Sequence, residues 1–302
     1  MIKSVKVINH KGESLLMNLK RPENFAITNI TGVGPVKATI NTTELSLSDG
    51  SVFNSAKKQQ RNIVFQFRIM PWSTVEQSRH VLYKYFPIKK PVTLIIETET
   101  RSVKTTGYVE SNEIKLFAND AKEGETAQVS IICPRSDFWA EYDEIANFNS
   151  YDGAFEFPFE NPTTGPELIL GNIREDNYIT IDYEGEANVG MTFVMRATNI
   201  VRDLKIRDLT RQTEINFDGS IIAQITGADI SANDEIVLCT ERGQKGVYLT
   251  RGAQSYNILP ALGINTTWFE LEPGENMYLM TAEVGATNIR CAIYYHTVYE
   301  GV

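Results

Sequence analysis

The chain has 302 residues, of which 42% are hydrophobic and 22% charged, and its formal net charge is -9 at pH 7. This length is typical of two domains, and the composition is that of a folded globular protein rather than a disordered one. The acidic balance argues against a main role in binding nucleic acid or anionic membranes.

The chain begins with the alternating segment "MIKSVKVINHKGESLL", which differs from the continuous apolar stretch of a secretory signal peptide. We therefore expect synthesis in the cytoplasm and no secretory export. The longest apolar runs, such as "VTLII" at Val92 to Ile96, are much shorter than the roughly 20 residues needed to span a bilayer. The sequence accordingly predicts no membrane partner.

Two short motifs precede the first strongly alternating strand. The stretch "TGVGPVKAT" superficially resembles a phosphate-binding loop, but the spacing from glycine to lysine is wrong and Pro35 removes an amide donor. A strained loop is the better interpretation. The basic run "KKQQR", Lys57 to Arg61, is too short for a nucleic-acid footprint and fits an exposed arm that meets an acidic protein surface.

One segment is predicted to form an amphipathic helix between strands. In Ser73 to Phe86, Ser73 and Glu76 have the spacing of a capping box. Val75, Leu82 and Phe86 form an apolar stripe, and Pro87 follows as a stop. The flanking segments "NIVFQFRI", "VTLIIETE", "KTTGYVE" and "TAQVSIIC" have the alternation of strands, so we expect this helix to pack on a sheet.

A domain boundary is expected where the alternation lapses between Pro134 and Gly153. Residues 1–140 form the first predicted domain, 141–153 the linker and 154–302 the second domain. Short strands with tight turns and almost no helix follow, from "FEFPFE" to "NIRCAIYYHTV", which favours two stacked antiparallel sheets. Cys133, Cys239 and Cys291 have no paired spacing, so we expect reduced and mostly buried thiols.

The residues that usually carry chemistry are not arranged as a catalytic or metal site in the sequence. The three histidines, His10, His80 and His296, have no partner at metal-ligand spacing, and no G-x-S-x-G motif occurs. The segment Asp229 to Thr240 begins like a calcium loop but lacks its turn glycine and its final glutamate. We expect no catalytic residues, no metal and no cofactor. The acidic cluster between Asp137 and Glu144 is interpreted as solvated charge of the linker.

The stretch "INTTWFELEPGENMYL" poses a choice between a sugar site and ordinary packing. Strand alternation places Trp268 and Glu270 on one face and Phe269 and Leu271 on the other. A symmetric turn at Pro273 and Gly274 would set Trp268 opposite Leu279 and Glu270 opposite Met277. This apolar company favours packing or subunit contact over sugar stacking, and Trp268 and Glu270 remain a candidate ligand or partner surface.

Two regions resemble the distal tail (Dit) proteins of long-tailed bacteriophages. The stretches "TNITGVGPVKATIN" and "LSDGSVFNSAKKQQRNIVFQFRI" resemble the N-terminal domain of that family. The stretches "SANDEIVLCTERGQKGVYL", "SYNILPALGINTTWFELEPGENMYL" and "GATNIRCAIYYHTVYEGV" resemble its C-terminal domain. The most specific parts are "WFELEPGEN" with the final "YEGV", and "DGSVFN" followed by "RNI".

The resemblance implies a mainly β fold. The first domain would be a β-sandwich or split barrel with one α-helix and a hairpin arm, and the second a galectin-like antiparallel β-sandwich. It implies a non-enzymatic structural protein of the virion, at the tail tip or baseplate, assembled in the host cytoplasm. Six copies would form a ring hub that joins the tail tube protein to the tail-tip or tail-associated lysin protein and can carry receptor-binding proteins.

The resemblance also suggests residues for the contacts between subunits. The arm and the ring contacts map to Asp49, Gly50, Phe53, Asn54, Arg61 and Asn62, and the loop with Gly32, Gly34 and Pro35 contributes to them. A chain with many strands and an arm has exposed strand edges, and a closed ring covers such edges so that they do not lead to aggregation. This physical argument agrees with the ring that the resemblance implies.

Two other functions compete with the hub. The first is a carbohydrate-binding module for attachment to the host surface. Galectins use an H-x-N-P-R strand, which is absent here, and Glu272 stands where their arginine would be needed. The second is a cell-wall hydrolase, for which no acid/base pair is visible in the sequence. The role of residues 172–203, the host and its receptor are left open.

Overall fold

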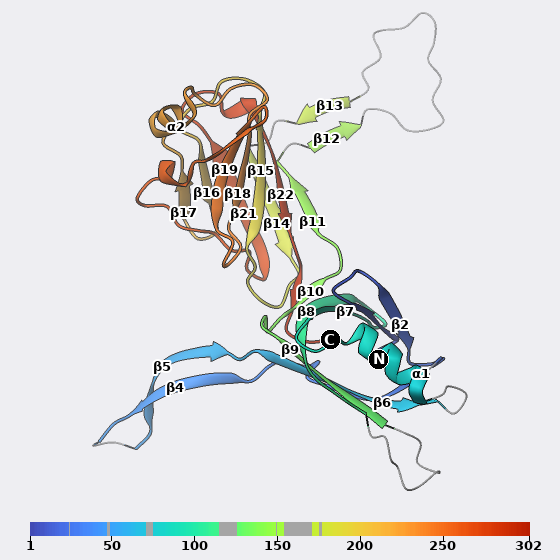
Figure 1. Cartoon of the computed structure of the whole chain (residues 1–302). Coiled ribbons are helices and arrows are strands. Elements are labelled where there is room, and N and C mark those ends of the chain that lie inside the picture. Colours follow the sequence, from blue (N-terminus) through green and yellow to red (C-terminus); the bar gives the residue numbers. More distant parts are fainter. Residues whose placement is uncertain are drawn as a thin grey trace, which may run out of the picture. The chain divides into compact units, whose positions relative to one another are not determined.

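The computed structural model describes residues 1–23, 25–46, 49–70, 75–114, 126–148, 150–153, 171–174 and 177–302, with the backbone alone for Val75, 150–153 and 171–174. It divides into a first unit, Met1–Tyr142 with Val298–Val302, and a second unit, Asp143–Thr297. Antiparallel strands dominate both units, which confirms the prediction of a mainly β fold (Figure 1). The predicted strand "FEFPFE" and the helix cap at Ser73 lie outside the described residues.

The first unit is built on one sheet of nine strands. Its main path runs in the order β2-β1-β7-β8-β9-β6-β3, and β10 pairs with both β8 and β23. The strands are β1 (Ser4–Ile8), β2 (Ser14–Asn18), β3 (Phe25–Thr31), β6 (Arg61–Ile69), β7 (Pro91–Glu97), β8 (Ser102–Ile114), β9 (Thr126–Cys133), β10 (Phe138–Ala140) and β23 (Val298–Tyr299).

The 13-residue strand β8 divides this sheet into two halves. Its first part, Ser102–Tyr108, pairs with β7, and the part from Tyr108 to Ile114 pairs with β9 across a bulge at Glu110. Bulges bend a strand and increase its twist, so the two halves can fold toward each other. The first half-sheet is β2-β1-β7-β8-β10-β23, and the second is β8-β9-β6-β3.

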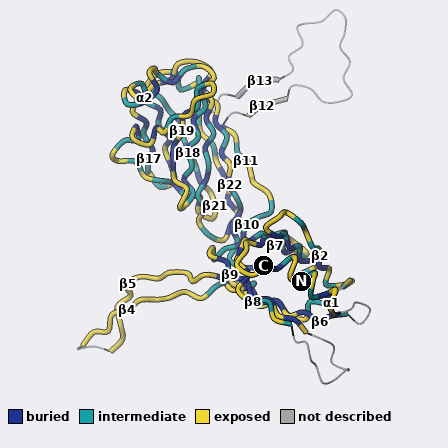
Figure 2. Tube along the Cα trace, viewed as in Figure 1, coloured by how far each residue is buried: buried dark blue, intermediate teal, exposed yellow. Residues whose placement is uncertain are grey.

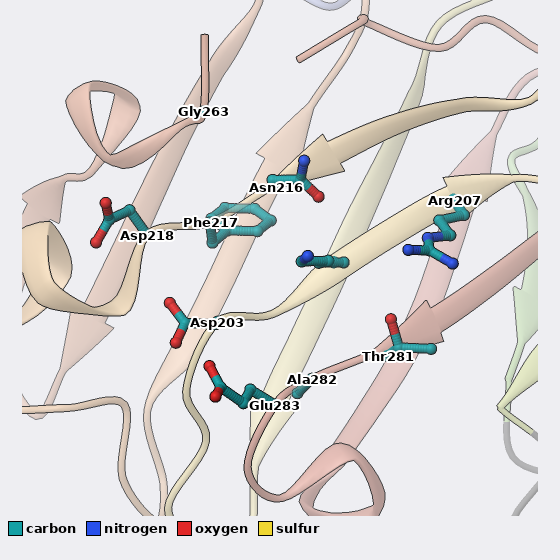
Figure 3. Close-up of a pocket in the computed structure, with 10 residues that line it drawn as sticks. Asp203, Arg207, Asn216, Phe217, Asp218, Gly263, Thr281, Ala282 and Glu283 are labelled. Atoms are coloured by element: carbon teal, nitrogen blue, oxygen red, sulfur yellow. The ribbon is translucent and has the colours of Figure 1, made fainter. Parts of the chain in front are cut away.

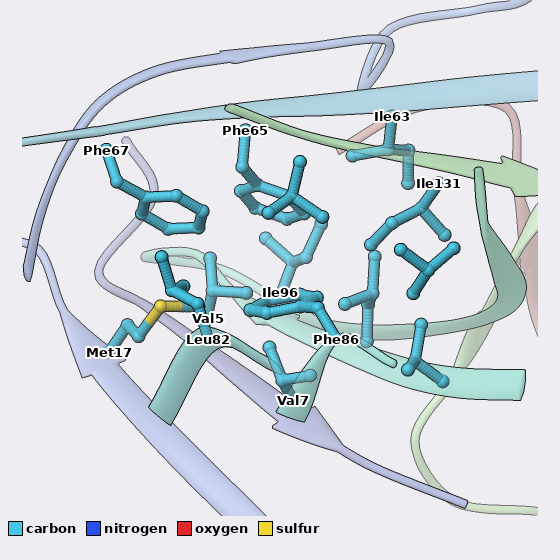
Figure 4. Close-up of a cluster of buried hydrophobic side chains, with 14 of the residues drawn as sticks. Val5, Val7, Met17, Ile63, Phe65, Phe67, Leu82, Phe86, Ile96 and Ile131 are labelled. Carbon is cyan, nitrogen blue, oxygen red and sulfur yellow. The ribbon is translucent and has the colours of Figure 1, made fainter. Parts of the chain in front are cut away.

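Both half-sheets turn their apolar faces into one core (Figure 4). Val5 and Val7 of the first half and Phe65 and Phe67 of the second are fully buried. The Phe65 and Phe67 rings lie 5.8 Å apart between centroids. Because side chains alternate between the faces of a strand, the remaining faces of the two half-sheets point away from this shared core.

Helix α1, Val75–Tyr85, fills the space between the half-sheets. Leu82 and Phe86 are fully buried in the core, as the predicted apolar stripe requires. The Phe86 ring lies 6.3 Å from Phe65 and 6.0 Å from Phe67. The amphipathic helix predicted from the sequence is therefore confirmed within its described residues.

The second unit is a sandwich of two antiparallel sheets, in the orders β11-β22-β15-β18-β19-β20 and β14-β21-β16-β17. A separate pair is formed by β12 (Ser150–Gly153) and β13 (Gly171–Arg174). The other strands are β11 (Glu144–Asn147), β14 (Tyr178–Tyr183), β15 (Met191–Ala197), β16 (Lys205–Asp208), β17 (Thr213–Asn216), β18 (Glu235–Cys239), β19 (Gly246–Arg251), β20 (Gln254–Asn257), β21 (Gly274–Thr281) and β22 (Ile289–Tyr295).

Aromatic side chains hold the two sheets of this sandwich together. Phe193 of β15 packs edge-on against Tyr278 of β21, with 6.1 Å between ring centroids. Tyr183 of β14 packs in the same way against Tyr295 of β22, at 6.0 Å. Such edge-to-face pairs add to the stabilisation from apolar burial.

The second unit also contains a helix that the sequence analysis missed. Helix α2, Gly219–Thr226, is preceded by Asp218, whose side chain accepts hydrogen bonds from the amides of Ser220 and Ile221. Gly227 follows it in the left-handed conformation, with φ of 83°. Both are ordinary signals for the two ends of a helix. Two short 3-10 turns, η1 (Leu259–Ala261) and η2 (Ala286–Asn288), complete the unit.

The predicted hairpin around Trp268 is wrong. Strand β21 pairs with β14 and β16, so that Leu279 lies opposite Tyr178 and Arg207 rather than Trp268. Trp268 itself stands in an irregular segment. The buried Asn276 explains the difference, because its side chain bonds the amide of Glu272 and the carbonyl oxygens of Glu272 and Gly274. These bonds close a local loop between Glu272 and Asn276, and the residues before this loop do not pair with β21.

Candidate assembly surfaces

The hairpin of β4 (Ala38–Glu44) and β5 (Ser51–Lys58) forms an arm that is exposed on both faces. Its two strands pair with each other and form a sheet of their own. Every residue of both strands is exposed (Figure 2). A two-stranded hairpin is only marginally stable in water, and its outer edges offer unpaired backbone groups. This arm therefore leaves both of its faces and the outer edges of both strands open to solvent.

The side chains of the arm combine apolar and polar groups. Ile40 lies opposite Ala56, and Thr42 lies opposite Phe53, so these four share one face. Ile40 is 63% exposed and Phe53 is 62% exposed. On the other face, Asn54 at the bulge donates a hydrogen bond to Thr43. The exposed isoleucine and phenylalanine are the apolar contacts that a partner would bury.

The base of the arm is held by charged groups. The Lys58 ammonium lies 3.0 Å from Asp137 and 2.7 Å from Glu300. Burial alone would lower the pKa of Lys58, but its bonds to the two carboxylates outweigh this effect and raise the pKa. The backbone amide of Gln59 also donates to the carbonyl oxygen of Lys37. These contacts fix where the arm leaves the first unit.

Arg61, at the start of β6, binds four backbone carbonyl oxygens beside this base. Its guanidinium donates to Gly32 and Gly34 at 2.6 Å each, to Ser136 at 2.8 Å and to Glu300 at 2.7 Å. It also stacks 4.1 Å from the centroid of the Phe138 ring. Arg61 is 1% exposed, and burial lowers its pKa. The side chain thus joins three loop segments inside the unit and is not presented to a neighbouring subunit.

The Gly32 to Pro35 loop is shaped by close backbone contacts. Gly32 has φ of 80°, and a Cβ atom there would lie 1.8 Å from the carbonyl oxygen of Asn62. Gly301 approaches the same loop, because its Cβ would lie 3.3 Å from Gly34 and from Pro35. The amide of Val302 donates to Val33. Two stretches that carry the family resemblance, "GVGP" and "YEGV", therefore meet in one place.

The sequence-predicted interface residues separate into two groups. Asp49, Gly50, Phe53 and Asn54 lie in the arm, where Gly50 has φ of 97° in the bend before β5. The second group, Gly32, Gly34, Pro35, Arg61 and Asn62, lies at the base. Asn62 is exposed, and its side-chain oxygen accepts a hydrogen bond from Ser130. Whether these residues contact another subunit stays a prediction, and Arg61 could act on such a contact only indirectly.

The second predicted surface, Trp268 with Glu270, is half-buried in the second unit. The Lys245 ammonium lies 5.6 Å from the centroid of the Trp268 ring. A cation over the ring competes with a sugar for the same stacking position. Phe269 and Leu271, which the alternation places on the other face, are buried. A ligand or partner at Trp268 and Glu270 also stays a prediction.

A polar cleft of about 530 Å³ lies at the β16, β17 and β21 sheet (Figure 3). Three of its charged side chains have structural roles. Asp203 accepts the amide of Gly219, Asp218 caps α2, and Arg207 pairs with Glu214 at 3.3 Å. The cleft offers no nucleophile with an adjacent base among its described lining residues.

The calcium-loop segment is held by arginine side chains. Asp234 is 1% exposed and receives two bonds from Arg251, at 2.9 and 2.6 Å. Asp229 accepts a bond from Arg202 at 2.8 Å. Burial alone would raise the pKa of Asp234, but Arg251 and Ser231 outweigh it and lower the pKa. These carboxylates are structural ion pairs of the second unit.

Two further kinds of feature, metal sites and membrane-spanning helices, are absent from the described residues. No group of three or more His, Cys, Asp or Glu side chains in the described ranges is placed to hold a metal ion. Within those same ranges, neither α-helix has the length and apolar character needed to cross a bilayer.

No protein-family model and no curated protein matches the sequence significantly. Solved structures do match the fold. The SPP1 Dit protein, described as a paradigm of the hub adsorption apparatus in phages that infect Gram-positive bacteria, aligns with a TM-score of 0.63 and 12% identity, over 98% of this chain and 99% of that one. The chain has the fold of a Dit protein.

Two baseplate structures align with lower scores. The phage P2 baseplate in its activated conformation with Ca gives a TM-score of 0.49 and 14% identity, and covers 100% of both chains. The same baseplate with Sr gives 0.47 and 13% identity, over 97% of both chains.

Proposed function

We propose that the chain is a structural hub of a phage tail tip or baseplate. In this proposal, six copies form a ring through their first units, and the arm of each copy covers part of its neighbour. The ring joins the tail tube protein to the tail-tip protein, and the second unit can carry receptor-binding proteins. The fold shared with the SPP1 Dit protein supports this role.

The observation that carries the proposal is the arm. A hairpin exposed on both faces, with Ile40 and Phe53 uncovered, is costly in an isolated molecule. Repeating one contact around a closed ring covers each arm with the same surface of the next copy. A protein whose best-defined feature is such an arm acts by offering surfaces to other chains.

The test is the mass of the full chain in solution together with negative-stain images. We expect an annulus with sixfold symmetry at concentrations that match assembly. Replacing both Ile40 and Phe53 by serine should leave the monomer folded, because both side chains are exposed, and should abolish the annulus. Ile264→Ser is the matched control, since Ile264 is 100% exposed but lies in the second unit. A wild-type chain that remains monomeric would contradict the ring.

The location in the virion has its own test. Antibody against the second unit should label one end of the tail of intact particles. Labelling along the whole tail would contradict a hub at the tip.

A further inference from the structure

The two units of the chain carry opposite charge. The first unit contains 19 lysines and arginines against 15 acidic residues, a net of +4, and the second contains 10 against 23, a net of -13. The overall value of -9 therefore hides a basic first unit. Charge on this unit is also unevenly distributed between the outer faces of its two half-sheets.

The outer face of the first half-sheet is cationic and partly apolar. One continuous row crosses five strands, and its members are Leu16, Lys6, Ile95, Lys104 and Trp139. Arg135 lies over the Trp139 ring at 4.3 Å. Lys6 and Lys104 form no ion pair with another described residue. At the edges of the face, Glu97 accepts a hydrogen bond from Ser4 and Glu141 accepts one from Ser102. Asp137, which lines a cleft with Lys104 and Trp139, is paired with Lys58. We call this surface the cationic face.

The outer face of the second half-sheet is acidic and rich in amides. Glu113 of β8 lies opposite Gln128 of β9, which lies opposite Gln66 of β6, and Glu110 stands at the bulge of β8 beside Ser130. Glu110 accepts a bond from Ser130, and neither glutamate has an ion-pair partner among the described residues. Arg68 is the basic residue at the far end. A cleft of about 270 Å³ lies beside Glu113. We call this surface the acidic face.

These two faces point away from each other, because both half-sheets use their other faces for the common core. They therefore cannot neutralise each other within one copy. Head-to-tail association requires complementary surfaces on opposite sides of a unit, and it forms a ring when the rotation between successive copies closes. Opposite charges also guide encounter and fix the register of an interface.

We propose that the cationic face of one copy docks on the acidic face of the next copy. This inference rests on the proposed ring and names the surfaces that form it. Lys6 and Lys104 would meet Glu110 and Glu113 across the contact, and Leu16 and Ile95 would supply apolar burial. The contact is heterologous, with different residues on its two sides.

The experiment uses two charge-reversed forms of the full chain. One carries Lys6→Glu with Lys104→Glu, and the other carries Glu110→Lys with Glu113→Lys. Either form alone juxtaposes like charges at every contact, so association should weaken at least about tenfold. A 1:1 mixture restores opposite charges at every contact of an alternating ring, so assembly should return.

The controls separate folding, general charge and the ring itself. A form with Lys11→Glu and Arg242→Glu has the same change in net charge as the form with Lys6→Glu and Lys104→Glu, at exposed sites outside both faces, and should assemble normally. Circular dichroism of each form checks that it is folded. Normal rings from either reversed form, or a mixture that stays dissociated while both forms are folded, would overturn the interface and leave the hub in place. Wild-type chains that form no ring would overturn both.

Discussion

Arg61 donates a hydrogen bond of 2.7 Å to the carbonyl oxygen of Glu300, a residue 239 positions further along the chain. The same guanidinium binds three more carbonyl oxygens from two other loops. Charged donors make stronger hydrogen bonds than neutral ones, and this guanidinium is itself almost fully buried. A single side chain therefore joins the Gly32 to Pro35 loop and Ser136 to the last segment of the first unit, alongside the pairing of β10 with β23.

Replacing Arg61 by alanine should destabilise the first unit by about 3–5 kcal/mol, because four backbone carbonyl oxygens lose a charged donor. Arg61→Lys keeps the charge, but one ammonium group cannot reproduce the hydrogen bonds that the planar guanidinium makes in several directions. We therefore expect a loss of stability between that of Arg61→Ala and wild type. Urea unfolding of the full chain measures both. A stability of Arg61→Ala within 0.5 kcal/mol of wild type would show that the carbonyl contacts are dispensable.

Gly32 and Gly34 should respond differently to the same substitution. Gly32→Ala places a methyl group 1.8 Å from the carbonyl oxygen of Asn62 in a left-handed backbone, so we expect a loss of at least about 2 kcal/mol. Gly34→Ala meets no atom within 4 Å and should change stability by less than about 1 kcal/mol. Thermal melting of both forms provides the comparison, and equal melting temperatures would refute the steric account.

The Asp234 carboxylate should make stability depend on pH in the acid range. Its pKa is lower in the folded chain than in the unfolded one, so its contribution is complete above about pH 4 and is lost as the pH falls through the folded value. Asp234→Asn should cost about 3 kcal/mol at pH 6 and progressively less below pH 4. Urea titrations between pH 2.5 and 6 test this.

Asp229→Asn is the matched control for that measurement. The partner of Asp229, Arg202, has a side chain that is 54% exposed, so solvent screens the pair and we expect a loss below about 1 kcal/mol. A pH dependence that is the same in both variants would assign the effect to another group.

The three cysteines should react with a thiol reagent at different rates. Cys133 and Cys291 are buried, and burial raises the pKa of both thiols. Cys239 is half-buried on a strand of the six-stranded sheet. Iodoacetamide should therefore label Cys239 of the folded chain first, and at least about tenfold faster. Cys239→Ser should remove the fast phase, whereas fast labelling at Cys291 would mean that the second unit opens readily.

Alternation along strands carried most of what could be predicted. It located β6, β7 and β9, and it placed Phe269 and Leu271, which are both buried, on the face opposite Trp268. When the alternation of the segment Asn62 to Ile69 is continued by one residue toward the N-terminus, Arg61 falls on the inward face with Ile63 and Phe65. From the sequence alone, an arginine at the start of an apolar strand would be assigned to the surface. The carbonyl groups that accept its hydrogen bonds come from loops distant in the sequence, so the local pattern gives no sign of them.

The misplaced hairpin and the missed helix have different causes. Pro273 and Gly274 do make a turn, but Asn276 closes it locally, and pairing partners of β21 come from β14 and β16. Long-range packing decides which strands pair, and a short stretch of alternating residues carries no information about it. The helix α2 had both end signals, Asp218 and Gly227, but its eight residues lie among strand-like segments. The return of Val298–Val302 to the first unit had no local signal.

That return sets an order of events during synthesis. Strand β10 cannot pair with β23, and Arg61 cannot bond Glu300, until all of the second unit has been translated. At typical rates of roughly 5–20 residues per second, this interval lasts on the order of 10–30 seconds. A nascent chain therefore cannot complete the base of its arm before Glu300 has been translated.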